Sequence, residues 1–333
     1  MNISPKISVG VPAYNQGCYL RQTLNSLLNQ SVPPVEIVVS NNHSTDDTGD
    51  ILNEFQDRVR IVQPERHVGM MQNWNFVASH LTGDWFTLLS SDDVAKPHFV
   101  ETLLQGTRKS GNAVLVRSGW ENIDAVGNII EKRPLLSVKE ITSPPQTFYE
   151  QLIGPKVSFA AFAIKKDAWE EVGGFPEECH YYGDWAMWLN LALKGDFVHE
   201  KGLITQYRMD YRPNINRERI IRSLKDELSI SRDVIPSVAE KFAGIDFGRI
   251  DKARKSRFLN SLVNTSQVMG TLDEIERMEI TNNFVSWADA IGIDLENLDA
   301  WRKFNAGEII ETRNLMTGLK VWARKRYIGL RRF

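Results

Sequence analysis

The sequence predicts an α/β fold with a mainly parallel sheet, followed by a C-terminal α-helical region. Three observations lead to this prediction: β-type segments alternate with segments of helical periodicity, each predicted strand ends in a polar loop, and charged amphipathic helices dominate the last third. Strands separated by helices are joined by right-handed crossovers and pair in parallel. Their polar ends are therefore expected along one edge of the sheet, where α/β proteins bind ligands.

The first part of the chain repeats the order strand, loop, helix. The predicted strands are Ile7–Val11, Val35–Val39, Arg58–Val62 and Phe86–Leu89. Leucines recur at helical spacing over Leu20–Leu28, and the pattern predicts another helix over about Met70–His80. After the second strand, Ser44 or Thr45 is predicted to cap a helix that begins near Asp47.

Two adjacent carboxylates follow the fourth strand. Asp92 and Asp93 stand between this strand and Lys96-Pro97, which closes the loop. Two carboxylates held together repel each other unless a proton, a basic side chain or a divalent cation intervenes. Hard oxygen ligands select magnesium, manganese or calcium, and magnesium usually joins one or two carboxylates to the phosphates of a substrate. From these residues alone, a metal site and a solvated loop that begins a helix at Pro97 are both open.

The composition predicts a soluble cytoplasmic enzyme of two domains. The chain has 333 residues, 42% of them hydrophobic, which is enough for a large core. A formal net charge of -2 argues against nucleic acid as the main partner. Cys18 and Cys179 fit no disulfide framework and no zinc spacing, so both are expected to be reduced thiols. The sequence shows neither an apolar signal region nor a run of about 18 uncharged apolar residues, so no standard secretion signal and no membrane span are predicted.

Seven motifs occur in an order and spacing that resemble a known family. The first four are VPAYN (11–15), EIVVSNNHSTDDT (36–48), HVGMMQNWN (67–75) and LLSSDD (88–93). The other three are VGGF (172–175), YGDWAMWLNLALKG (182–195) and the pair Tyr207-Arg208. The first set resembles the nucleotide-sugar part of the inverting family 2 glycosyltransferases, and the second set resembles their acceptor part. The resemblance covers residues 5 to about 212 and implies a Rossmann-like GT-A catalytic domain over residues 1–212.

This resemblance implies a site for a nucleoside-diphosphate sugar and a divalent cation, manganese or magnesium. Asp92 is expected to ligate the metal directly and to contact the donor, with Asp93 in support. Tyr14 is expected to stack on the nucleobase. The matching motifs predict donor contacts at Pro12, Tyr14, Asn15, Asn41, Arg66, Asn73, Asp92 and Arg208.

Several of these positions have a plainer alternative. Arg66 could reach the diphosphate, although a solvated arginine is more common, whereas Arg208 is expected to clamp the diphosphate. Asn73 and Asn75 are expected to order the loops more than to contact the donor, because asparagine bonds readily to nearby backbone. Pro12 could equally belong to an ordinary turn at the end of a strand.

The sequence departs from the family pattern at three places. The family often has Asp-Asp where this chain has Asn41-Asn42; an amide can still pair with an imide edge, but the choice among uracil, thymine and guanine stays open. Ser90 stands at the first aspartate of the family's metal motif, which leaves Asp92 and Asp93 as a shifted pair. Asp210 stands where relatives often carry a histidine ligand, and it could bind the same ion or be a plain surface residue.

Asp184 is the residue to which the resemblance assigns catalysis. Glycosyl transfer requires that the acceptor hydroxyl lose its proton while it attacks the anomeric carbon opposite the leaving group, and this attack inverts the configuration. A carboxylate commonly takes that proton. Asp184 precedes an apolar-rich helix that contains Trp185 and Trp188, so a helix cap is the alternative role.

Residues 213–333 are predicted to form a helical region that packs on the catalytic domain or on a second subunit. Pro213–Asn216 is predicted to be a linker, and Arg219–Ile235 and Lys252–Met269 are predicted helices. The segment Arg313–Phe333 carries seven basic residues and no acidic one, with apolar residues roughly opposite on a helical wheel. Such a tail can lie on an anionic membrane or pack on its own domain, and the sequence leaves both open.

These observations favour a metal-dependent inverting glycosyltransferase of polysaccharide biosynthesis. It would be of the hexosyltransferase type and act on a glycan or lipid-linked acceptor, in the cytoplasm or at the inner face of the cell membrane. One alternative is a sugar-1-phosphate nucleotidyltransferase, but that class needs an early Gly-rich basic loop, and this region offers only Gly17 and Arg21. The other is an inactive nucleotide-sugar binding module, against which Asp92, Asp93 and Asp184 argue.

Overall fold

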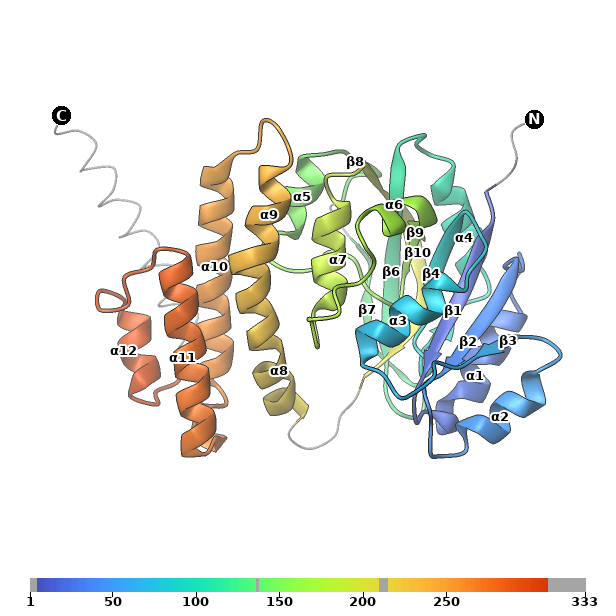
Figure 1. The fold of residues 1–333 in the computed structure, drawn as a ribbon, viewed down its shortest axis with the longest axis horizontal. Helices are drawn as coiled ribbons and strands as arrows, with labels where there is room; N and C mark the ends of the chain where they lie inside the picture. The colour runs from blue at the N-terminus through green and yellow to red at the C-terminus, as the bar shows by residue number, and fades with distance from the viewer. Residues whose placement is uncertain (1–4, 136–137, 210–214, 311–333) are drawn as a thin grey trace. The chain divides into compact units, whose positions relative to one another are not determined.

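The computed structural model describes residues 5–135, 138–209 and 215–310 (Figure 1). The chain divides into two compact units. The first comprises residues 1–151 and 155–213, and the second comprises residues 152–154 and 214–333. The first unit contains the sheet with its helices, and the described part of the second unit is helical.

Several predictions concern residues outside the described part of the chain. The predicted domain boundary between residues 212 and 213 lies there and stays a prediction, as do the roles considered for Asp210 and for the tail Arg313–Phe333. Helix α8 begins at Ile215, so the second half of the predicted linker Pro213–Asn216 is helical.

The first unit is built on a ten-stranded sheet with the strand order β3-β2-β1-β4-β9-β6-β10-β5; β7 pairs with β6, and β8 pairs with β10. The four predicted strands are present as β1 Ile7–Ala13, β2 Glu36–Asn41, β3 Arg60–Val62 and β4 Trp85–Leu88. The others are β5 Val94–Ala95, β6 Ala113–Ile123, β7 Ile129–Arg133, β8 Ile141–Thr142, β9 Phe162–Lys165 and β10 Asp196–Arg208.

Most of the sheet runs in one direction, as predicted. β1 pairs in parallel with β2 and β4, β2 with β3, and β6 with β10. β9 is antiparallel to both β4 and β6, so β6 and β10 run the same way as β4. The short strands β5, β7 and β8 are also antiparallel to their neighbours. The mainly parallel α/β architecture is therefore confirmed.

The register of β1 brings three strand ends to one edge of the sheet. Ala13 lies opposite Asn41 on β2, and Gly10 lies opposite Leu88 on β4. β1 extends past its predicted end through Pro12, which has no N–H to donate. No ladder bond is lost, because the Pro12 nitrogen faces the side on which β4 has already ended.

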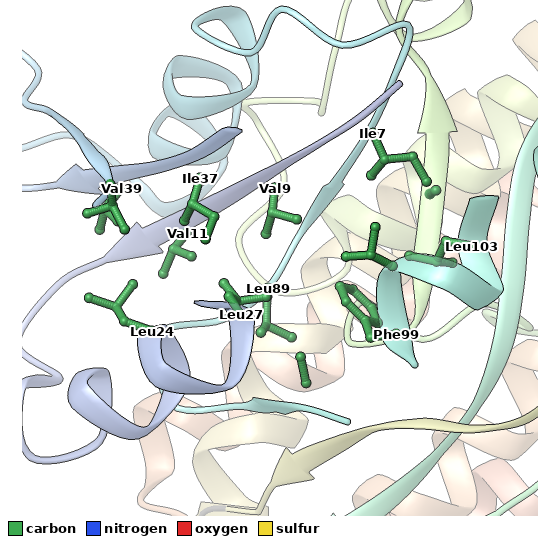
Figure 2. Close-up of a cluster of buried hydrophobic side chains, with 14 of the residues drawn as sticks. Ile7, Val9, Val11, Leu24, Leu27, Ile37, Val39, Leu89, Phe99 and Leu103 are labelled. Carbon is green, nitrogen blue, oxygen red and sulfur yellow. The ribbon is translucent and has the colours of Figure 1, made fainter. Parts of the chain in front are cut away.

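Helices cover both faces of the β1–β4 part of the sheet. On one face lie α1 (Gly17–Leu28), α2 (Thr48–Phe55) and α4 (Phe99–Thr107), and Figure 2 shows Val9 and Val11 of β1 packed with Leu24 of α1. On the other face lies α3 (Met70–Ser79), where a Cβ on Gly10 would lie 3.2 Å from Cγ2 of Val77. Further helices of this unit are α5 Gln146–Gln151, α6 Lys166–Glu171 and α7 Gly183–Leu191.

The second unit has a core of aromatic side chains. Phe258, Phe284 and Trp287 pack together, and Trp301 and Phe304 join the same buried cluster. No helix among the described residues is both long and apolar enough to cross a bilayer. The helices are α8 Ile215–Ser229, a π-helical turn Ile230–Val234, α9 Ile235–Glu240, α10 Phe247–Ser266, α11 Glu274–Ala290 and α12 Asp299–Asn305.

The side chain that accepts a hydrogen bond from the start of α2 is that of Asp46, and not that of Ser44 or Thr45. The Asp46 carboxylate accepts the N–H of Thr48 at 3.1 Å and the N–H of Gly17 at 3.0 Å, so it serves the first amides of two helices. Ser44 Oγ instead accepts the N–H of Asn15. The predicted cap was wrong because the second loop folds back on the first, and this bonding between loops has no signature in the local sequence.

Asp46→Ala is expected to lower the melting temperature, because it leaves amides at two helix starts without their acceptor. The loss of a cap costs about 0.5–2 kcal/mol. Asp47→Ala is the matched control, because Asp47 occupies the N-cap position of α2 without a side-chain cap bond. Thermal unfolding followed by circular dichroism measures both, and equal losses in the two variants would contradict the assignment.

Candidate active site

The acid loop, residues Ser90–Asp93, lies at the end of β4. The N–H of Leu89 still donates to the Gly10 carbonyl at 2.9 Å, and the N–H of Asp93 then closes a turn on the Ser90 carbonyl at 3.1 Å. Helix α1 holds the loop from one side: the Thr23 hydroxyl lies 2.9 Å from the Ser91 carbonyl and 2.7 Å from the Asp93 carbonyl. This turn presents Asp92 partly exposed and buries Asp93 completely.

Asp93 is a buried carboxyl with one oxygen unsatisfied. Its Oδ1 accepts the Arg208 N–H at 2.8 Å, whereas Oδ2 has no hydrogen-bond partner in the described part of the chain. Burial raises the pKa of Asp93 well above its usual range, and the neighbouring Asp92 charge raises it further, although the Arg208 N–H and charge act in the opposite direction. Arg208 therefore offsets only part of the cost of holding the two carboxyls together.

The acid loop fits a divalent cation that takes its other ligands from a substrate. The donor set consists of carboxylate oxygens, which hard cations prefer, and one of those oxygens is buried and unpaired. No group of three or more potential metal-ligating side chains was found in residues 5–135, 138–209 and 215–310. Such a sparse set is typical of magnesium and manganese sites completed by phosphates.

An aromatic pair lies at the neighbouring strand end. The Tyr14 ring follows β1, is 46% exposed, and its centroid lies 4.5 Å from that of His67. Asn15 adopts a positive φ of 52°, which asparagine tolerates, and its Oδ1 accepts the Thr45 N–H at 2.7 Å. The sequence pattern indicated Tyr14 and Asn15 but missed His67, whose only signal was its place at the start of the third motif.

The two asparagines after β2 have different partners. Asn41 Oδ1 accepts the Ser44 N–H at 3.0 Å, so the amide oxygen already takes part in the turn. Asn42 is buried, and its amide bonds at 2.9 Å to both the N–H and the carbonyl of Val68. Asn42 therefore joins the second loop to the third, which also carries the exposed Arg66.

Helix α3 connects the donor motifs with the acceptor motifs. Asn73 is buried and its Oδ1 accepts the Ser40 hydroxyl at 2.6 Å, while the Asn75 amide bonds at 2.8 Å to both the N–H and the carbonyl of Phe175. A Cβ on Gly183 would lie only 2.0 Å from the Met71 sulfur, so the start of α7 packs tightly on α3. These contacts give the two asparagines a loop-ordering role; the predicted donor contact of Asn73 stays a prediction.

Asp184 lies in the first turn of α7. The N-cap position of this helix belongs to Tyr182, which makes no side-chain cap bond, so Asp184 is not the N-cap considered as its alternative role. Its Oδ1 accepts the Trp185 N–H at 2.7 Å, and a carboxylate is favoured near the positive end of a helix. Trp185 fixes this turn through its indole N–H, which donates to the Gln151 carbonyl at 2.7 Å.

Arg208 is buried behind the acid loop. All three guanidinium nitrogens donate within the chain, to the carbonyls of Asp92, Asp124 and Ala125 and to Oε1 of Gln22. Four of the five N–H donors are thus already engaged, so the predicted diphosphate clamp could use only the fifth without breaking one of these bonds.

Asp93→Asn is expected to raise the melting temperature in the absence of metal at pH 7, by roughly 2–4 °C if the change is worth about 1 kcal/mol. Asparagine still accepts the Arg208 N–H but carries no charge to bury. A carboxyl whose folded-state pKa is raised destabilises the fold as the pH rises through the range between its usual and its raised pKa. The difference between the variant and the natural chain should therefore be small near pH 4 and grow toward neutral pH. A natural chain that is more stable than the variant throughout would contradict this expectation.

The chain is similar to known glycosyltransferases. Residues 8–172 match the model of the family described as glycosyl transferase family 2. Chondroitin synthase from Escherichia coli is 30% identical over 201 residues, which are 59% of this chain but only 28% of that protein. GalNAc(5)-diNAcBac-PP-undecaprenol beta-1,3-glucosyltransferase from Campylobacter jejuni is 27% identical over 251 residues, 69% of this chain and 77% of that protein.

Solved structures share the fold. S. aureus TarS 1-349 in complex with UDP-GlcNAc has a TM-score of 0.68 at 16% identity, over 91% of this chain and 88% of that one. The mannosyltransferase PcManGT from Pyrobaculum calidifontis, in complex with GDP-Man and Mn2+, has a TM-score of 0.55 at 16% identity, over 99% and 84%. With its motifs, its sheet and its family match, the part of the chain over residues 8–172 belongs to glycosyl transferase family 2, and the chain has the GT-A fold.

Proposed function

We propose that the chain is a metal-dependent, inverting glycosyltransferase. It moves a sugar from a nucleoside-diphosphate sugar to a hydroxyl of a glycan or of a lipid-linked acceptor. The proposal rests on two features that meet at one edge of the sheet. Tyr14, whose ring contacts that of His67, follows β1, and the acid loop with Asp92 follows the neighbouring parallel strand β4. Aromatic rings suit a nucleobase, and the carboxylates suit a cation bound to a diphosphate.

The donor side of the site binds and orients the nucleotide. Tyr14 and His67 offer ring faces to the base, and Asn41 lies in the adjacent turn with its oxygen already bonded. Asp92, supported by Asp93, would hold a cation that offsets the charge developing on the departing diphosphate. UDP-GlcNAc and GDP-Man are the donors bound in the two solved structures of similar fold, so both nucleotide classes are candidates here.

Asp184 is proposed to act on the acceptor. Its carboxylate takes the proton of the acceptor hydroxyl as the oxygen forms its bond to the anomeric carbon and the bond to the diphosphate breaks. Attack opposite the leaving group inverts the anomeric configuration. The packing of α7 on α3 through Gly183 and Met71 ties this carboxylate to the helix that follows the donor loop.

The acceptor class and the place of action belong to the same proposal. One relative is named for an undecaprenol-linked acceptor, which fits a protein that works at the cytoplasmic face of a membrane. The basic tail Arg313–Phe333 lies outside the described residues, and both alternatives, contact with anionic lipid and packing on the protein, stay open for it. The helical unit is the candidate surface for a second subunit.

The nucleotidyltransferase alternative is less consistent with the first helix. That chemistry would need the start of α1 to hold a triphosphate, yet the Gly17 N–H already donates to the Asp46 carboxylate. Asp47 Oδ1 also lies where a Cβ on Gly17 would be, at 1.8 Å. Two carboxylates at this helix start repel a triphosphate.

A donor panel tests the proposed function. Thermal shifts with UDP-, dTDP- and GDP-sugars, each with manganese and with EDTA, should reveal one nucleotide class whose stabilisation depends on metal. Asp92→Asn should abolish the metal-dependent part and leave the fold intact, because the amide is a poor substitute for a metal-binding carboxylate. Calorimetry with the corresponding nucleoside diphosphate measures this loss directly. The absence of any metal-dependent binding in the natural chain would refute the cation, and unchanged metal-dependent affinity in the variant would refute the role of Asp92.

Asp184→Asn is expected to lower kcat by roughly 10²–10⁴-fold with little change in donor affinity, because a general base acts in the transition state. The measurements are turnover with a working donor and acceptor, and the Kd for the donor. Asn190→Asp, on the last turn of the same helix, adds a carboxylate away from the site and serves as control. Turnover near normal in Asp184→Asn would leave this residue with a structural role only.

A further inference from the structure

We propose that Arg208 is a positioning residue, which holds the acid loop in the conformation that lets Asp92 bind a cation. The inference rests on the proposed metal dependence and gives the arginine a role other than contact with the diphosphate. Its basis is the set of bonds from one buried residue to two consecutive aspartates. Those partners lie 115 and 116 positions away in the sequence.

Arg208 donates hydrogen bonds to the acid loop at two points. Its main-chain N–H donates to Oδ1 of Asp93 at 2.8 Å, and its side-chain Nε donates to the carbonyl of Asp92, also at 2.8 Å. One bond fixes the side chain of the second aspartate, and the other fixes the peptide between the two. The backbone from which the Asp92 carboxylate extends is therefore held in place by these two bonds.

The other end of the guanidinium is anchored to two further elements. Nη1 donates to the carbonyls of Asp124 at 2.9 Å and Ala125 at 3.0 Å, in the turn between β6 and β7. Nη2 donates to Oε1 of Gln22 on α1 at 2.8 Å, and the guanidinium carbon lies 4.3 Å above the ring of Tyr19 on the same helix. The arginine thus ties the acid loop to both α1 and the β6–β7 turn.

The β6–β7 turn is itself rigid. The Asp124 carboxylate accepts the N–H of Val126 at 3.0 Å and the N–H and side-chain amide of Asn128 at 2.8 and 3.0 Å. Because the turn is closed by these bonds, its carbonyls form a fixed receptor for Nη1. A rigid anchor is what a residue needs if it is to position another group.

Arginine is the residue type that this arrangement requires. A planar guanidinium carries five N–H donors in fixed directions, so it can reach the acid loop, the turn and α1 at the same time. Lysine provides the same charge from a single point and cannot keep all of these bonds. The positive charge also lies close to the two aspartates, where it reduces the repulsion between them before any cation binds.

The test compares nucleotide affinity with and without metal. Calorimetry with UDP, and in parallel with GDP and dTDP, is carried out in manganese and in EDTA for the natural chain, Arg208→Met and Arg208→Lys. The loss of a residue that orients a metal ligand typically weakens metal binding by about 10–100-fold. We call the ratio of the nucleotide affinity in manganese to that in EDTA the manganese gain. In Arg208→Met the manganese gain should fall by about 10–100-fold, while the affinity in EDTA stays unchanged. Arg208→Lys should recover part of the manganese gain.

Arg117→Met is the matched control. Arg117 is also fully buried, pairs with Glu150 at 2.8 Å and donates to the Lys156 carbonyl, but it makes none of the bonds to the acid loop. It should lose thermal stability and keep the full manganese gain. If Arg208→Met does not fold, Gln22→Leu removes only the Nη2 bond of Arg208 from an exposed position on α1 and should reduce the gain by a smaller factor.

The outcomes separate this inference from the proposed function. No manganese gain in the natural chain refutes the cation itself, and the inference with it. A full gain in Arg208→Met, or in Gln22→Leu where the former cannot be made, refutes the positioning role alone. A loss of affinity in EDTA as large as the loss in manganese identifies Arg208 as a diphosphate contact and also overturns the inference.

Discussion

The rest of the site depends on one constraint, the placement of two neighbouring carboxyls at the end of a buried strand. Asp93 lies completely inside the protein, and Asp92 next to it is partly exposed. Such a pair is unfavourable unless the surroundings supply positive charge and donors. Arg208, at the end of β10, supplies both, and the Thr23 hydroxyl of α1 holds the loop through the main-chain carbonyls of Ser91 and Asp93. One buried oxygen of Asp93 nevertheless stays without a donor in the described chain, so the loop is incomplete in a way that a bound cation would complete.

The parallel pairing of β1 with β2 and β4 explains why loops distant in sequence bond to one another. Once the three strand ends meet at one edge, Asn15 can bond to the second loop, and Asn42 can bond to the third. Each of these asparagines satisfies backbone groups that the end of a strand leaves unpaired. These hydrogen bonds between loops therefore hold the loops together. The side chains that remain exposed there, such as Tyr14 and Arg66, are the ones available to a ligand.

The sequence predicted the fold better than it predicted the bonds within the site. Local periodicity was sufficient for the four strands, the helices between them and the helical C-terminal region, and the family motifs indicated Asp92, Tyr14 and Asp184. The sequence could not supply contacts between residues that are far apart in the chain. Examples are the hydrogen bonds of Asp46 to the helix starts, the ring contact of His67 with Tyr14, and the hydrogen bond of Arg208 to Asp93. Strand β9 was missed for a related reason, since a four-residue apolar segment shows no period and its antiparallel place is set by its neighbours.

The same reasoning explains why the chain keeps an arrangement that is not optimal for stability. A buried carboxyl with a raised pKa is a cost to the folded state at neutral pH, and an asparagine at the same place would avoid it. An asparagine, however, would not supply the negative charge that, under the proposed function, supports a cation beside Asp92. Arg208 resolves part of this conflict, because it stabilises the loop through the main-chain carbonyl of Asp92 and one oxygen of Asp93. The bonds of Arg208 therefore stabilise the loop through its backbone, and under the proposed function the charge of the two carboxyls serves to bind the cation.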